Sequence, residues 1–196
     1  MSITENMKWG EKYRCNSENK IPQKLQNKWL EKWSIFPDSA RILDLASGLG
    51  ANALYMASQG KNVVAIDIAE DALFALKKNA SSKKLNLDLV VADLDLFFLP
   101  ENYFDGVICF YYLNRKLFGE IRKSLKSGGL FIMETYLETQ LNNSCINQRH
   151  KLKQKELLFE FRDFEVLDYI EETSYGIALE DNNQLNSIAK FCARKR

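Results

Sequence analysis

The chain has 196 residues, of which 46% are hydrophobic and 27% are charged, an ordinary balance for one globular domain. Its 27 basic and 26 acidic side chains leave a net charge of +1, which gives no general attraction to nucleic acid or to an anionic membrane. No apolar run approaches the roughly 18 residues that a membrane helix needs. Four scattered cysteines predict neither a zinc site nor disulfides, so we expect a cytoplasmic protein without a bound metal.

Strands and helices alternate along the first two thirds of the chain. Hydrophobic residues at helical spacing, with Trp29 and Trp33 among them, predict a packing helix over Gln23–Trp33. The strands predicted beyond it are Arg41–Ala46, Asn62–Ile66, Leu87–Val91, Phe104–Tyr111 and Leu130–Thr135. The helices predicted between them are Ala51–Ser58, Glu70–Ala80 and Arg115–Leu125. This alternation indicates βαβ units and a mostly parallel sheet with helices on both faces.

The last third of the chain has a different pattern. A polar stretch, Leu137–His150, is followed by a predicted helix at Lys153–Phe161 and by predicted strands at Glu165–Ile170 and Ile188–Ala193. The connection Glu171–Ser187 has no clear crossover helix, so the two strands should pair antiparallel. We therefore predict an α/β fold, a three-layer α-β-α sandwich whose seven-stranded sheet is mostly parallel and has an antiparallel C-terminal hairpin.

Three acidic residues, Asp44, Asp67 and Asp93, stand at or near the carboxyl ends of successive predicted strands. That edge of an open α/β sheet is where ligands bind. Asp67 follows Asp44 by 23 positions, close to the spacing of roughly 20 residues at which an acid reaches ribose hydroxyls. Gly48 and Gly50 allow the backbone to approach a ligand closely.

The stretch Arg41–Gly50, RILDLASGLG, resembles the first motif of class I S-adenosylmethionine-dependent methyltransferases. Further segments resemble the later motifs of that family: Ala65–Ile68, Ala92–Leu94, Phe104–Ile108 and Leu125–Leu130. The resemblance implies a Rossmann-like fold, S-adenosylmethionine as cofactor and methyl transfer. We expect a single domain with an N-terminal arm and helix (1–38), a cofactor-binding core (39–136), a substrate lid (137–152) and a C-terminal helix and hairpin (153–196).

The same resemblance implies roles for individual residues. Asp44 and Gly48–Gly50 would face the methionine part of the cofactor, Asp67 the ribose, and Asp93–Leu94 the adenine. Ala46 departs from the motif, which often has glycine there. The expected cofactor-binding residues are Asp44, Ala46, Ser47, Gly48, Gly50, Asn52, Asp67, Ile68, Asp93, Leu94 and Phe110.

Shorter motifs resemble small bacterial methyltransferases of the tellurite-resistance and thiopurine type. They are Lys8–Tyr13, Ala51–Ala53, Phe110–Tyr112 and Glu134–Tyr136. Two alternatives stay open, an NAD(P)-binding oxidoreductase and a non-catalytic S-adenosylmethionine-binding module. Gly48–Ala53 does match the dinucleotide pattern G-x-G-x-x-A. However, Asp44 would place a carboxylate near the pyrophosphate, whereas it suits an ammonium or a sulfonium.

Methyl transfer from a sulfonium needs alignment of donor and acceptor, and a base only when the acceptor must lose a proton. We expect in-line displacement with little or no general-base help. The sequence assigns no catalytic residue, and the candidates are Tyr111, Tyr112 and His150. The tyrosines either line an acceptor pocket or pack in the core, and His150 is either a lid residue or a surface residue. Polar side chains in Leu137–His150 indicate a small polar or anionic acceptor. We expect no nucleic-acid or membrane partner, and we expect a monomer or homodimer.

Overall fold

The structure is a computed structural model that describes residues 28–138, 147–175 and 185–196. Its strands are β1 (Arg41–Leu45), β2 (Asn62–Asp67), β3 (Leu87–Val91), β4 (Phe104–Phe110), β5 (Leu125–Tyr136), β6 (Glu165–Tyr175) and β7 (Leu185–Arg194). Its helices are α2 (Lys28–Trp33), α3 (Ala51–Ser58), α4 (Glu70–Ser82), α5 (Leu117–Ser124) and α6 (Glu156–Glu160), with a 3₁₀ turn, η1 (Gln148–His150). Within the described ranges, no helix combines the length and the apolar character needed to span a bilayer.

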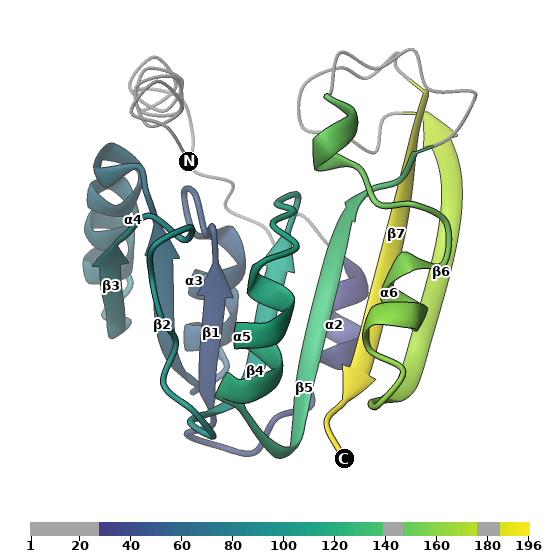
Figure 1. The fold of residues 1–196 in the computed structure, drawn as a ribbon. Helices are drawn as coiled ribbons and strands as arrows, with labels where there is room; N and C mark the ends of the chain where they lie inside the picture. The colour runs from purple at the N-terminus through teal and green to yellow at the C-terminus, as the bar shows by residue number, and fades with distance from the viewer. Residues whose placement is uncertain (1–27, 139–146, 176–184) are drawn as a thin grey trace.

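All of these strands join one seven-stranded sheet in the order β3-β2-β1-β4-β5-β7-β6. The pairs among β1 to β5 are parallel, and β7 lies antiparallel between β5 and β6. Figure 1 shows the carboxyl ends of the parallel strands at one edge, with β7 running the other way. The predicted fold class is confirmed. The chain moves outward from β1 to β3 and then returns to β4, so the order reverses between β1 and β4.

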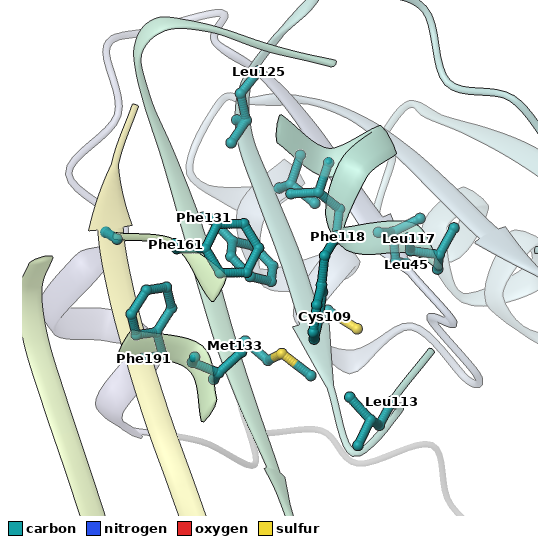
Figure 2. Close-up of a cluster of buried hydrophobic side chains, with 14 of the residues drawn as sticks. Leu45, Cys109, Leu113, Leu117, Phe118, Leu125, Phe131, Met133, Phe161 and Phe191 are labelled. Carbon is teal, nitrogen blue, oxygen red and sulfur yellow. The ribbon is translucent and has the colours of Figure 1, made fainter. Parts of the chain in front are cut away.

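Helices cover both faces of the sheet, as the alternating pattern predicts (Figure 1). On the face of α5 and α6, the rings of Phe131, Phe161 and Phe191 pack with centroids 4.9–6.0 Å apart (Figure 2). On the other face, Leu30 of α2, Met56 of α3 and Leu76 of α4 are fully buried in a second cluster. Each face therefore has its own apolar core, and the sheet separates the two.

The packing role predicted for Trp29 and Trp33 is confirmed. Both indole Nε1 groups donate to Asp168 Oδ2 of β6, each at 3.1 Å, and Lys32 Nζ donates to the same oxygen at 2.9 Å. One carboxylate thus ties α2 to the far edge of the sheet. The predicted start of this helix, Gln23–Asn27, lies outside the described residues.

Two predicted boundaries are wrong because contacts with other strands set them. Strand β5 begins at Leu125, where a helix end was predicted, because Leu125 pairs with Phe104 of β4, and a bulge in β5 separates this pair from the regular pairing that starts at Leu130. Helix α6 begins at Glu156 and not at Lys153, because Lys155 has φ +58°, a left-handed conformation that a right-handed helix cannot include. The hairpin strands are also longer than predicted, since β6 continues to Tyr175 and β7 starts at Leu185.

Candidate functional site

The loop between β1 and α3 lies at the reversal of strand order and turns sharply. Ala46, Gly48 and Gly50 all have positive φ, at +54°, +53° and +74°. Ser47 N–H donates to Ile66 O of β2 at 3.0 Å, and Gly50 N–H donates to Ser47 O at 2.9 Å. Positive φ is uncommon for alanine, so this loop is held by its neighbours in a conformation that is costly for Ala46.

Gly50 has a second reason to be glycine besides ligand approach. A Cβ built on Gly50 would come within 2.4 Å of the side-chain carbons of Leu76 on α4. Since φ is also in the left-handed region, any side chain there would be strained as well as crowded. The sequence signals the glycine, but only the fold reveals that it lets α3 approach α4.

Asp44 is deeply buried at this edge, with 2% of its surface exposed. Burial raises its pKa to about 8, the nearby Asp67 carboxylate adds to the rise, and the Ala53 backbone N–H opposes it. Within the described ranges, Asp44 Oδ2 and the buried Ser47 Oγ have no hydrogen-bond partner. A buried carboxylate in this condition is destabilising unless a cation or a donor reaches it. The ammonium of S-adenosylmethionine is such a group, so the residues present fit that cofactor.

Asp67 braces the loop from the end of β2. Its Oδ2 accepts from Gly48 N–H at 2.7 Å and its Oδ1 from Ala69 N–H at 2.8 Å. Burial raises the pKa of Asp67, and the two N–H groups oppose that rise. Each carboxylate oxygen can accept more than one hydrogen bond, so a braced Asp67 can still receive ribose hydroxyls. The carboxylate is therefore fixed in place before any ligand arrives.

The remaining expected cofactor residues lie along the same edge. Leu94 is buried in the α5-side core, and half-buried Asp93 caps its own turn by accepting from Asp95 N–H at 2.9 Å. The positions that are partly exposed are Ala46, Ser47, Asn52 in the first turn of α3, Ile68 and Phe110. Their contacts with a cofactor stay predictions, but the fold does gather them around the β1–β4 switch point.

The two candidate tyrosines follow β4 at this edge. Tyr111 has φ +55°, and its hydroxyl donates to the carboxylate of Glu134 on β5. Tyr112 packs against the α5-side core, and burial raises its pKa to about 12. Glu134 is 2% exposed and was not predicted as a site residue. In the sequence, Glu134 is a single acid in an apolar strand, and its contact with Tyr111 becomes visible only when β4 and β5 lie side by side.

His150 lies at the base of the predicted lid. Arg149 Nε lies 2.9 Å from His150 Nε2, and Arg115 donates to the Arg149 and Lys151 carbonyls. Leu152 N–H donates to Tyr136 O, and Glu138 N–H donates to Leu152 O, so the two ends of this segment are joined beside β5. Residues 139–146, which include Asn142 and Asn143, lie outside the described residues, and the lid itself stays a prediction.

Comparisons with known proteins agree with this geometry. Residues 42–129 match the family model described as a methyltransferase domain. TehB of Haemophilus influenzae, a probable S-adenosyl-L-methionine-dependent methyltransferase, is 26% identical over 164 residues, covering 80% of this chain and 57% of TehB. The demethylmenaquinone methyltransferase of Thermus thermophilus is 33% identical over 100 residues, 47% of this chain and 46% of that enzyme. The chain thus spans little more than half of TehB.

Solved structures show the same fold. The crystal structure of Haemophilus influenzae TehB matches with a TM-score of 0.75 at 21% identity, covering 85% of this chain and 61% of TehB. A methyltransferase from Methanosarcina mazei matches with a TM-score of 0.68 at 18% identity, covering 86% of this chain and 97% of that one.

Fold, motifs and relatives point the same way. Residues 42–129 are similar to a methyltransferase domain, and the fold and sequence motifs of the chain are similar to those of class I S-adenosylmethionine-dependent methyltransferases. Among the relatives compared, it resembles TehB.

Proposed function

We propose that this chain transfers the methyl group of S-adenosylmethionine to a small-molecule acceptor by in-line displacement. The observation that carries the proposal is the buried Asp44 carboxylate, whose Oδ2 has no partner in the described part of the chain. When bound, the cofactor supplies a methyl group activated by a positively charged sulfur. Asp44 would hold its ammonium, Asp67 its ribose, and Asp93 with Leu94 its adenine.

The protein's contribution is positioning and charge. Asp67 is already oriented by two backbone N–H groups, so little ordering would remain to be done when ribose hydroxyls reach it. Once ionised on binding, Asp44 supplies negative charge in a water-poor site, where its interaction with a cation is stronger than in solvent. Holding donor and acceptor in line can contribute up to about 7–11 kcal/mol to catalysis in well-oriented cases.

The NAD(P)-binding alternative is not favoured. A pyrophosphate would sit at the start of α3, where the Ala53 N–H already acts on the Asp44 carboxylate. The second alternative, a module that binds the cofactor without turnover, has the same cofactor site and differs only in activity. Measurement of product therefore decides between it and the proposed enzyme.

Partners and compartment belong to the proposal as well. A net charge of +1 supports a small acceptor over a nucleic acid. The two cysteines in the described ranges, Cys109 and Cys192, are free and buried, which supports the cytoplasm as the compartment. We propose a monomer or homodimer, with residues 137–152 closing over the acceptor.

Two measurements test the proposal. S-adenosylhomocysteine should raise the melting temperature of the purified protein, as a ligand specific to the folded state must, and NADH should not. The protein should then release S-adenosylhomocysteine from S-adenosylmethionine with at least one member of a panel of thiols, oxyanions, amines, phenols and RNA. A shift with NADH alone would favour the dinucleotide alternative, and cofactor binding without product would favour the non-catalytic module.

A further inference from the structure

A cluster of ionisable side chains lies at the carboxyl ends of β4 and β5, beside the cofactor site. The Tyr111 hydroxyl donates to Glu134 Oε1, and the Tyr136 ring packs 5.4 Å from that of Tyr111. Lys190 of β7 is the register partner of Glu134 and forms an ion pair with Glu172 of β6. Two carboxylates, one lysine and two phenols thus lie on neighbouring strands at this edge.

Glu134 holds Tyr111 in a costly conformation. Tyr111 has φ +55°, which is rare for a bulky residue, and its N–H donates to the Glu134 carbonyl at 2.7 Å. The backbone carbonyl of Glu134 therefore fixes the backbone of Tyr111, and the side-chain carboxylate of Glu134 fixes its hydroxyl. Strain that is held in place at a ligand-binding edge points to function.

The strand register places Tyr111 on the opposite side of β1 from Asp67. Leu45 of β1 pairs with Cys109, so Tyr111 lies two residues beyond that pair, one strand away from the loop that begins at Ala46. Neighbouring strands are about 4.8 Å apart. Asp67, the expected ribose residue, follows β2 on the other side of β1. Tyr111 and Glu134 therefore flank the methyl-transfer edge from the side opposite the ribose.

The charges around Tyr111 keep its phenol protonated. Burial raises the Tyr111 pKa most, and the Glu134 carboxylate, Tyr136 and Glu172 raise it further. A hydroxyl oxygen can accept a hydrogen bond while it donates one. The neutral phenol of Tyr111 can therefore accept an O–H or N–H from a substrate while its own proton points to Glu134.

We propose that Tyr111 receives an acceptor that still carries its proton, a neutral hydroxyl or amine compound, and relays that proton to Glu134. The acceptor oxygen or nitrogen forms a bond to the methyl carbon, and the carbon–sulfur bond breaks with its electron pair left on sulfur. The acceptor proton moves to Tyr111 Oη as the phenol proton moves to Glu134, which later releases it to water. Tyr111 is then a catalytic residue, and Glu134 is the positioning residue that takes up the proton.

This mechanism rests on the proposed function and departs from the expectation of little or no general-base help. The relay matters only for acceptors that must lose a proton. A thiolate, which is already deprotonated, should bypass it. The two kinds of acceptor therefore separate a relay from a merely structural tyrosine.

The test compares 4-methylphenol, neutral at pH 7, with 4-nitrothiophenol, a thiolate at that pH. Tyr111→Phe and Glu134→Gln should each lower kcat/KM for the phenol about 100-fold or more, the usual loss when acid–base help is removed, and leave the thiolate within about threefold. Glu134→Asp, which keeps a carboxylate, should restore part of the phenol activity and its pH profile. Tyr55→Phe, which removes the hydroxyl that contacts Ser34, is the matched control and should leave both activities unchanged.

A second readout does not depend on turnover. In protein labelled with 3-fluorotyrosine and saturated with S-adenosylhomocysteine, the fluorine resonance lost in Tyr111→Phe should move on adding 4-methylphenol and should be displaced in Glu134→Gln. Equal losses on both acceptors, or a resonance that ignores the phenol, would overturn the relay. A wild-type protein that methylates the thiolate but not the phenol would do the same. If S-adenosylhomocysteine binds but no acceptor of either kind is methylated, the proposed function itself fails.

Discussion

Asp44 is a carboxyl group of the cofactor site whose charge should change when the pH rises from 6 to 8. Its pKa of about 8 leaves it about 90% protonated at pH 7 in the free protein. If Asp44 pairs with the cofactor ammonium, binding must ionise it and release about 0.9 proton at pH 7. The free energy of that ionisation falls by about 2.3 kcal/mol between pH 6 and pH 8, which corresponds to about 50-fold in affinity.

Calorimetric titration with S-adenosylhomocysteine, which carries the same ammonium, measures both quantities. The binding enthalpies measured at pH 7 in phosphate and in Tris should differ by about 0.9 times the difference between the ionisation enthalpies of the two buffers. Asp44→Asn should abolish the proton release and most of the pH dependence. Asp88→Asn, at an exposed position on β3, is the matched control. Identical enthalpies in both buffers, or proton uptake, would refute the pairing of Asp44 with the ammonium.

Three further outcomes are expected. Asp67→Ala should weaken S-adenosylhomocysteine binding by roughly 2–4 kcal/mol in calorimetry, because charge-assisted hydrogen bonds lose their acceptor, and unchanged affinity would exclude the ribose role. Gly50→Ala should lower the free energy of unfolding in urea by about 1–3 kcal/mol, because its Cβ collides with Leu76, and a neutral result would contradict the close approach of α3 to α4. Asp168→Asn should lower the melting temperature at pH 7. Since the Asp168 pKa is lowered in the fold, its stabilising effect is lost as the pH falls through that pKa, so the difference from wild type should shrink in acid.

Much of the fold could be predicted because its signals are local. Helix α3 and strand β3 have the predicted bounds, since a glycine loop precedes α3 and a short apolar run marks β3. The start of β5 could not be predicted, because it depends on a pair between Leu125 and Phe104 of β4, about 20 residues away in sequence, and on a bulge in β5 after that pair. The true start of α6 depends on the left-handed Lys155, whose N–H donates to Tyr169 and Glu171 of β6.

Asp44 and Asp67 could be proposed as cofactor-site residues from the sequence for the same reason. Asp44 and Asp67 lie near the carboxyl ends of consecutive strands at a spacing that carries chemical meaning. Glu134 could not be proposed as a site residue from the sequence, because its role depends on strand register: it pairs with Phe110 of β4 and with Lys190 of β7. A single acid between methionine and threonine in an apolar strand has no periodicity that distinguishes it from an edge residue.

Two buried acids on either side of β4 differ in ways that suit different tasks. Asp44 on β1 and Glu134 on β5 are both 2% exposed, so neither is solvated by bulk water. Within the described ranges, Asp44 Oδ2 has no donor, which favours a ligand that brings positive charge. Glu134 already receives a phenol proton donor and has Lys190 as its register partner, so its charge is supported without a ligand. We therefore expect the cofactor ammonium on the β1 side and a protonated acceptor on the β5 side. The methyl group would then be transferred near the end of β4, which lies between these two strands.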